Sequence, residues 1–362
     1  MKSIGIDIGQ FSVKIAEVES SSKGVTIQRR QEIPINQDPN RDKNLEILEI
    51  LRAAAPSHAG ARSKIVTALA LDEIAILPTT FPFPQRLKIL KSAPFELEDE
   101  IPLEISEAMF DVRIRKISKE HTDTLTLAVP KETIKEKLNQ LKDAMLDPHI
   151  LTVDAFALAN LFESWQLPPQ QELPTNKVSA TETLLNQIPE APAQTPLNLG
   201  HDPSLARFVQ NGQLLDARSM DFGGHDVAEA IARSYSVPFV EALRMLQNQG
   251  SILTVSAGAT REQQTMSNTI TGALTMLAHE LRLMAIEWRT KFHVPLSEIL
   301  LTGGLSQIQN IAPFFTQSIE IPTNLYRYLE NGFQLRTETK ASTEAVMGLA
   351  LGIAIEGLRR PK

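Results

Sequence analysis

The chain has 362 residues, of which 42% are hydrophobic and 22% are charged, and it carries a net charge of −7 with a pI near 5.6. Because a single hydrophobic core stops growing beyond roughly 250–300 residues, at least two lobes are expected. The acidic balance argues against a nucleic-acid-binding protein, which would need a basic face. The sequence contains no cysteine, which excludes disulfides, thiolate metal sites and a cysteine nucleophile and suits a reducing cytoplasm.

The first 165 residues have the pattern of one mixed α/β lobe. Residues 3–8 and 12–18 alternate as two strands around a short turn, and the start of the chain lacks the charge and apolar pattern of a secretion signal. Helical spacing follows at 45–55 and a strand at 65–71. Residues 73–145 then predict a small inserted subdomain. Its expected elements are a Phe-Pro bend at 81–84, a helix at 85–100, strands at 108–117 and 124–129, and a helix at 131–145.

Residues 166–196 interrupt the hydrophobic pattern. Six prolines and five glutamines are interleaved there with small polar residues. This composition is typical of a flexible linker or surface loop, which is tolerated because loop-closure entropy rises slowly with length. A specific binding role for the loop is the alternative. A second lobe is expected at 197–362, with a subdomain of the cleft at about 226–296.

The second lobe again mixes strands and helices. Strands are expected at 197–199, 206–210, 213–221 and 296–301, and helices from 224, at 239–248, 306–316 and 343–358. The clearest helix covers residues 267–292, with an apolar stripe that predicts core packing and consists of Ile270, Leu274, Leu277, Leu281, Met284, Ala285, Trp288 and Phe292. The apolar run at 345–355 is shorter than the roughly 20 residues of a membrane span, so we interpret it as a buried helix.

Three short segments carry the chemistry. In GIDIGQFSVKIAEV (5–18), Asp7 ends a strand and Gly9 permits a tight turn whose amides can cradle a phosphate. Asp7 could hold a hydrated divalent ion, and Ser12 and Lys14 could meet phosphate oxygens; a plain hairpin is the alternative. The segment LNLGHDPSLARFVQNGQLL (197–215) repeats the strand, turn, strand layout, which suggests a duplicated fold. In EILLTGGLSQIQNIAPFF (298–315), a strand enters a Gly-Gly turn and a helix.

In this order and spacing, the three segments resemble the phosphate-one, phosphate-two and adenosine elements of the actin, sugar kinase and Hsp70 superfamily. Three other segments look like the PilM family of type IV pilus assembly, and also like the PilM-type cytoplasmic domain of the type II secretion protein GspL. These segments are FELEDEIPLEISEAMFDVRI (95–114), ARSMDFGGHDVAEAIA (217–232) and STEAVMGLALGIAIEGL (342–358). The resemblance covers nearly the whole chain apart from the Gln/Pro-rich loop. It implies an α/β chain of the actin-like ATPase fold, with two lobes that each contain a ribonuclease-H-like sheet.

The resemblance also implies a cleft for ATP with magnesium, in which Asp7 would hold the metal. The residues that match the first phosphate turn are Asp7, Gly9, Gln10, Phe11, Ser12 and Lys14. Those that match the second are Asn198, Gly200 and His201, and those that match the adenosine turn are Gly303, Gly304 and Leu305. Glu241 and Arg244 stand where relatives have a glutamate and a lysine beside the ribose and adenine.

Asn198 departs from the pattern of the hydrolysing relatives, which have an aspartate there. An amide removes one negative charge near the metal and cannot accept a proton from attacking water at neutral pH. We therefore expect a cleft that binds weakly or is vestigial and has no catalytic residue. His201 and Asp202 could substitute as a base, but a structural role is preferred for them, as helix capping is for Asp226.

The family resemblance implies a cytoplasmic scaffold that docks the secretion or pilus assembly ATPase and an inner-membrane assembly protein, with the inserted subdomain as a docking surface. It would lie peripheral to the inner membrane or be tethered there, and a homo-oligomer stays open. An active ATPase or sugar-kinase-like phosphotransferase of the same fold is the alternative. Basic residues at 359–362 would suit either a span that follows, as in GspL, or a frayed end, and they leave PilM and GspL open.

Overall fold

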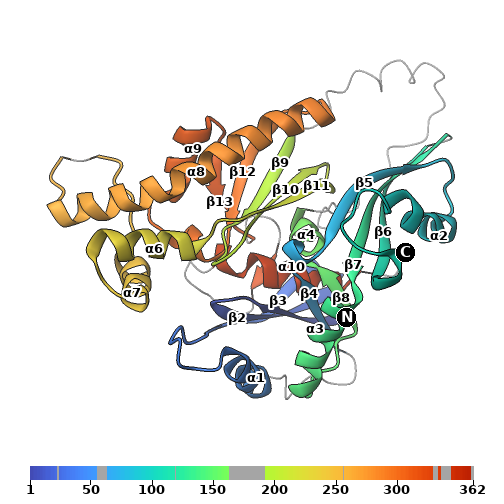
Figure 1. Cartoon of the computed structure of the whole chain (residues 1–362), viewed down its shortest axis with the longest axis horizontal. Helices are drawn as coiled ribbons and strands as arrows, with labels where there is room; N and C mark the ends of the chain where they lie inside the picture. Colours follow the sequence, from blue (N-terminus) through green and yellow to red (C-terminus); the bar gives the residue numbers. More distant parts are fainter. Residues whose placement is uncertain are drawn as a thin grey trace.

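Two large β-sheets and one small sheet form the framework of the molecule (Figure 1). The computed structural model describes residues 1–22, 24–54, 63–118, 120–162, 192–255, 257–328, 333–335 and 344–359. Most of the predicted Gln/Pro-rich loop lies outside these ranges, and its last residues already belong to a strand. The large sheets correspond to the two predicted lobes.

The first lobe is built on a six-stranded sheet with the order β14-β3-β2-β1-β4-β8. Its β1 pairs antiparallel with β2 and parallel with β4. Alternate residues of β1, Ile4 and Ile6, are buried in one core with Leu51 of α1 and Leu141 of α3. The elements of this lobe are β1 (Lys2–Ile8), β2 (Ser12–Ser21), β3 (Gly24–Pro34), α1 (Lys43–Ala54), β4 (Ser63–Leu69), α3 (Lys131–Asp143), β8 (Ile150–Val153), α4 (Asp154–Ala159), η3 (Asn160–Phe162) and β14 (Gln334–Leu335).

The inserted subdomain is a three-stranded sheet with the order β5-β7-β6, covered by α2. Its elements are η1 (Leu71–Glu73), β5 (Ala75–Phe81), α2 (Arg86–Leu97), η2 (Ile105–Glu107), β6 (Ala108–Ile117) and β7 (Thr122–Pro130). The sequence patterns did not predict β5, whose Pro78 is tolerated because β5 lies at a sheet edge. The predicted insertion included α3, but α3 packs on α1 through Leu141, so it belongs to the first lobe.

The second lobe contains a five-stranded sheet with the order β11-β10-β9-β12-β13. The predicted apolar stripe of its long helix α8 is confirmed as core: all its members from Ile270 to Trp288 are buried, and Phe292 packs against them. The elements are β9 (Ala193–Asn198), β10 (Ser204–Gln210), β11 (Gln213–Met220), α6 (Gly224–Tyr235), α7 (Phe239–Gln249), α8 (Arg261–Phe292), β12 (Leu296–Thr302), η5 (Gly304–Gln307), α9 (Ile311–Ile319) and β13 (Thr323–Leu325).

The end of the chain returns to the first lobe. The 3₁₀ helix η8 (Ala345–Met347) leads into α10 (Gly348–Glu356), which packs on β1, β2 and α4. A Cβ on Gly5 of β1 would lie 2.4 Å from the Ala350 carbonyl oxygen, so only glycine allows this approach. The prediction assigned these residues to the second lobe. The helix instead buries its apolar surface on every side between the first sheet and α4.

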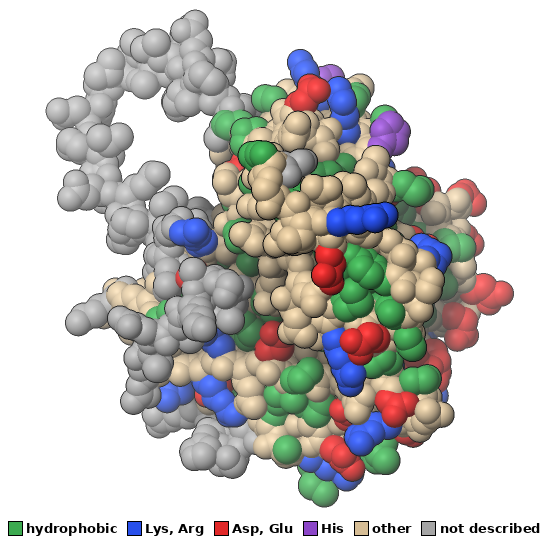
Figure 2. All heavy atoms as spheres, turned by 90° about the vertical axis from the view of Figure 1, so that its left-hand side faces the viewer, with side chains coloured by type: hydrophobic (Ala, Val, Ile, Leu, Met, Phe, Trp, Pro, Cys, Tyr) green, Lys and Arg blue, Asp and Glu red, His purple; other side chains and the backbone are tan. Residues whose placement is uncertain are grey.

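The described surface carries side chains of both charges. Figure 2 shows the side of the molecule that carries α6 and α7, where Lys and Arg side chains occur among Asp and Glu in the described part of the chain. No helix within the described ranges is both long and apolar enough to traverse a bilayer.

Candidate nucleotide-binding cleft

A cavity of about 550 Å³ lies between the two lobes. Its walls come from the turns after β1, β9 and β12, and α7 closes one end. Twelve of the sequence-predicted residues line it: Asp7, Gly9, Gln10, Phe11, Ser12, Lys14, Asn198, Gly200, His201, Gly303, Gly304 and Leu305. Three turns that are far apart in the sequence therefore meet at one site.

The turn after β1 presents one cation and one anion to the cavity. The Gly9 amide donates to the Ser12 carbonyl oxygen at 3.1 Å and closes the turn. The Lys14 ammonium lies 3.6 Å from the Asp7 carboxylate, and each side chain is 13% exposed. The Ser12 hydroxyl donates to Glu32 Oε1 at 2.9 Å, so it is engaged by the neighbouring strand β3. The pair Asp7–Lys14 has the charges that a metal ion and a phosphate would meet.

The turn after β9 is held by hydrogen bonds. The Thr302 hydroxyl, at the end of β12, donates to Asn198 Oδ1 at 3.2 Å and so fixes the side-chain amide of Asn198. The Gly200 and His201 carbonyl oxygens accept from the amides of Gly224 and His225 at 3.0 and 2.9 Å. These bonds join the turn to the start of α6, where the Asp226 carboxylate caps the helix, as predicted, by accepting from the Gly223 amide at 2.8 Å.

The Gly-Gly turn after β12 brings the backbone close to the second phosphate turn. Gly303 has a φ of +88°, and a Cβ there would lie 2.4 Å from the Leu199 carbonyl oxygen. Gly304 has open space where its Cβ would be, so a ligand can approach the chain there. The turn therefore needs glycine at Gly303 for its geometry and gains access from Gly304.

The end of the cavity beside α7 is apolar with amide groups. Its lining includes Leu243, Leu246, Gln247, Gln307 and Ile308. Glu241 and Arg244, the two residues predicted beside the base, do not line the cavity; they form an exposed ion pair at 3.4 Å. The helix turns positions 243, 246 and 247 toward the cavity, and Gly250 just after it also lines the cavity, whereas 241 and 244 lie on the other side of the helix.

A buried ion pair at the floor of the cavity was not predicted. Asp154 begins α4 and lines the cavity, and its Oδ1 atom lies 3.6 Å from Nη2 of Arg207 on β10. Neither of these two atoms has a hydrogen-bond partner in the described part of the structure. Burial raises the pKa of Asp154 to about 6, against the opposing effect of Arg207. A lone Asp after a four-residue strand carries no local signal by which the sequence could reveal it.

The cavity is strongly acidic. Six carboxylate side chains line it, and Lys14 is the one lysine or arginine among the described lining residues. The acidic residues are Asp7, Glu32, Asp72, Glu73, Asp154 and Asp202. Lys137 of α3 lies nearby; burial lowers its pKa, while Asp7, Glu73 and Asp154 raise it. This charge would repel a bare nucleoside triphosphate, so a nucleotide in this cavity would need a divalent cation with it.

The residues fit a nucleotide-bound metal better than a bare metal ion. Among the described residues, no three His, Asp or Glu side chains are grouped to hold a metal. Magnesium usually keeps several waters and uses one or two carboxylates plus phosphate oxygens. Asp7 can therefore act on a hydrated ion that arrives with the phosphates.

Aromatic side chains bridge the two lobes at the phosphate end. Phe11 of the first turn and His201 of the second have ring centroids 5.5 Å apart, and His225 and Phe239 extend the cluster. Burial, with smaller effects from His225 and Lys43, lowers the pKa of His201 to about 4. The imidazole is therefore neutral at pH 7 and is available as a ring to pack on, with no positive charge for a phosphate.

The family comparison decides what the chain is related to. The model of the family described as type IV pilus assembly protein PilM matches residues 5–358. This chain belongs to the PilM family. The sequence resemblance had pointed to PilM or to GspL, and the confirmed family is PilM.

Solved structures support the fold. The chain is similar to a structure described as the PilM-PilN type IV pilus biogenesis complex, with 19% identity, a TM-score of 0.78 and 99% of both chains covered. It also resembles ethanolamine utilization protein EutJ from Carboxydothermus hydrogenoformans, with 11% identity, a TM-score of 0.51, and 98% and 89% coverage. MreB5 of Spiroplasma citri bound to ADP matches with 10% identity, a TM-score of 0.52, and 97% and 94% coverage. The predicted actin-like ATPase fold is confirmed.

Proposed function

We propose that this PilM-family chain is a cytoplasmic scaffold of an inner-membrane assembly platform, in a type IV pilus or in the related type II secretion machinery. It docks the assembly ATPase and an inner-membrane protein, and its cleft binds nucleotide without hydrolysing it. The observation that carries the proposal is the surface of the inserted subdomain. Residues 92–112 contain seven acidic side chains and no Lys or Arg.

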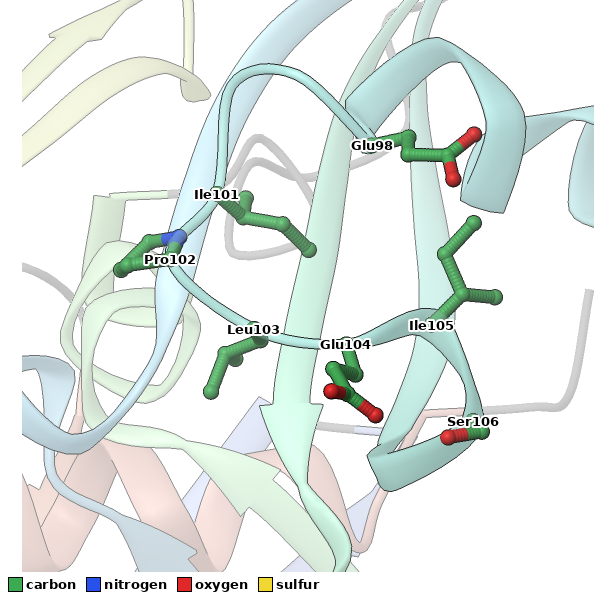
Figure 3. A pocket seen from close by; sticks show the side chains of 7 residues that line it. All are labelled: Glu98, Ile101, Pro102, Leu103, Glu104, Ile105 and Ser106. Atoms are coloured by element: carbon green, nitrogen blue, oxygen red, sulfur yellow. The ribbon is translucent and has the colours of Figure 1, made fainter.

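Part of this acidic segment lines an apolar depression. The chain from Glu98 to Ser106 lines it, with Ile101, Leu103 and Ile105 as its apolar side chains and Glu104 beside them. Figure 3 shows this segment as an arch between α2 and β6, with Ile101 and Ile105 pointing into it. An apolar surface with an acidic rim fits a short segment that combines aliphatic and basic side chains.

The outer face of α2 extends the same surface. Leu87 and Phe95, eight residues apart, are 75% and 74% exposed, although they are large apolar side chains. Residues at this spacing share one face of a helix, and Glu98 follows one turn later. Since a soluble chain seldom leaves such residues uncovered together, the face is suited to a protein partner. The similar structure described as a PilM-PilN complex supports a PilN-like protein as the inner-membrane partner.

The experiment is a titration calorimetry measurement with the cytoplasmic segment of the PilN counterpart from the same organism. We expect binding that weakens with salt, because acidic rim residues attract the partner. Glu98→Lys with Glu104→Lys should raise Kd at least tenfold, or about 1.4 kcal/mol. The matched control is Glu49→Lys with Glu280→Lys, which reverses two exposed acids on other elements. Binding that is equal in both double variants would contradict docking at this surface.

A second candidate function, an active ATPase of the same fold, is favoured by one observation. Asp154 lines the cavity, and burial raises its pKa to about 6, closer to the neutral pH at which a general base works. Calorimetric titration with Mg-ATP, followed by a phosphate-release assay on the same sample, separates the two. Binding without release supports the scaffold. Steady release that is lost in Asp154→Asn supports the ATPase.

A further inference from the structure

The inserted subdomain packs against the second lobe, although the chain inserts it into the first. Figure 1 shows β5 and β6 beside β11, and these strands are in contact. One apolar core joins all the parts involved. Its buried members are Leu125 and Leu127 of β7, Ala155 and Ala159 of α4, Leu205 and Val209 of β10, and Leu214 and Ala217 of β11, together with Leu71 and Val153.

The first lobe contributes to this core through Ala155 and Ala159 of α4 and through two residues that lie close to α4 in the chain or next to η1. Leu71 and Val153 follow or end the strands β4 and β8, just before η1 and α4. The other two apolar clusters of the subdomain contain, among the described residues, side chains from within 75–128 alone. The core beneath β1 and β2 contains no described residue of β5, β6 or β7. The buried apolar surface of the subdomain is thus shared with the second lobe and α4.

Two arginines of β6 reinforce this packing. The Arg113 guanidinium lies over the ring of Phe156 in α4, 4.8 Å from its centroid. Two residues later, at an irregularity in the pairing of β6 with β7, Arg115 Nη1 donates to the Leu215 carbonyl oxygen of β11 at 3.3 Å. The neighbouring Asp216 is itself fixed, because it accepts from Trp288 Nε1 and Lys291 Nζ of α8, both at 3.1 Å. β6 is therefore connected to α4 and to the second lobe's sheet.

The same core reaches the cavity floor. Arg207 of β10 donates from Nε to the Ala155 carbonyl oxygen at 3.1 Å and faces Asp154, which lines the cavity. Leu205, two residues before Arg207, belongs to both the core and the cavity lining. A change of angle between the lobes at α4 would therefore act on the packing that holds the subdomain.

We propose that the inserted subdomain moves with the second lobe, as one unit that turns about α4 against the first lobe. Closing or opening the cleft then changes the position of the acidic depression at 98–106 relative to β1–β4. This proposal rests on the proposed function in one respect, which is that a partner binds the depression. The movement itself requires no partner. A protein bound across the depression and the first lobe would sense the state of the cleft.

The absence of cysteine makes the movement measurable with pairs of spin labels. The exposed residues Glu49 of α1, Lys91 of α2 and Glu280 of α8, each changed to Cys in pairs, report the first lobe, the subdomain and the second lobe. On saturation with Mg-AMPPNP, we expect the 49–280 and 49–91 distances to shift together by about 2 Å or more, and the 91–280 distance to stay constant. A shifted 91–280 distance with a constant 49–91 distance would overturn the proposal. An unchanged 49–280 distance would overturn it too, because the lobe angle would then be fixed.

A second measurement needs neither nucleotide nor partner. In the 91–280 pair, Arg115→Met should broaden the distance distribution, because it removes the bond from β6 to β11. Lys116→Met, on the exposed side of the same strand, is the matched control and should leave it unchanged. Equal widths in the two variants would show that the subdomain is not held to the second lobe in this way. If the distances change as expected but the PilN-like protein does not bind, the result contradicts the scaffold proposal and does not contradict the coupled movement.

Discussion

Arg207 Nη2 lies 3.6 Å from Asp154 Oδ1, so two opposite charges from different lobes face each other in the interior without a direct hydrogen bond. Removing one partner of such a pair leaves an uncompensated buried charge. Arg207→Met should therefore lower the free energy of unfolding by about 3–5 kcal/mol. Adding Asp154→Asn should recover part of this loss. Urea unfolding of both single variants and the double variant measures the coupling, and additivity within about 0.5 kcal/mol would rule out the interaction.

Asp7→Ala should abolish nucleotide-dependent stabilisation. Asp7 is the carboxylate of the first turn, 3.6 Å from Lys14, and it is placed to act on a hydrated metal. The wild type should melt at a higher temperature with Mg-ATP than without, by mass action, and the variant should not. Glu49→Ala, an exposed acid on α1, is the control. Melting that is insensitive to Mg-ATP in the wild type would remove the basis for a live cleft.

Asn198→Asp should restore a carboxylate at the second phosphate turn. The Thr302 hydroxyl that donates to Asn198 Oδ1 at 3.2 Å can donate equally to an aspartate, so the geometry is kept. We expect half-saturation at a lower magnesium concentration and a higher rate of phosphate release. Asn198→Ala controls for loss of the amide. If Asn198→Asp matches the wild type in both measurements, Asn198 is not what limits turnover.

The stability of the protein should depend on pH through His201. Its folded pKa of about 4 lies below the ordinary histidine value of 6.5. This contribution is fully present above pH 6.5 and is lost as the pH falls through about 4, because the unfolded chain binds the proton first. The melting temperature of the wild type should therefore fall more between pH 7 and pH 4 than that of His201→Gln. Asp154 acts with the opposite sign but is common to both proteins, so parallel curves would contradict the assignment.

Two glycines provide a matched pair for the packing of α10. A Cβ on Gly5 would lie 2.4 Å from the backbone of α10, whereas a Cβ on Gly272 of α8 would meet nothing within 4 Å. Gly5→Ala should destabilise by at least about 2 kcal/mol through overpacking, and Gly272→Ala should stabilise by about 1 kcal/mol through helix propensity. Thermal unfolding measures both. A neutral Gly5→Ala would mean that β1 and α10 separate easily.

Local pattern and motif spacing were enough to locate the parts of this fold that depend on nearby residues. The stripe of α8 and the three glycine turns were predicted because each lies within one continuous segment. The sequence did not predict which lobe α10 joins, because a helix that is apolar on every side does not indicate which sheet it packs against. β5 was not predicted for a related reason. Pro78 argues against a strand unless the strand lies at a sheet edge, and the edge position of β5 depends on its pairing with β7.

The residues of the cleft also divide into those that the sequence located and those that depend on the arrangement of distant elements. Asp7, Gly9, Ser12 and Lys14 were predicted by residue type, the other residues of the turns were implied by the family resemblance, and the structure brings them together. Glu241 and Arg244 were implied by the family resemblance. They lie on a helix whose rotation about its axis the sequence does not determine, and they do not line the cavity. Arg207 belongs to a buried strand, and its meeting with Asp154 depends on how the two lobes are arranged.

The position of α10 also determines the order in which this chain can be completed during synthesis. β1 leaves the ribosome long before α10, yet part of its buried surface is covered by residues 348–356. Until those residues emerge, one face of the first sheet lacks its helix and exposes apolar side chains such as Ala16 and Val18. The second lobe can fold first around α8, whereas the first lobe is completed only after α10 has emerged.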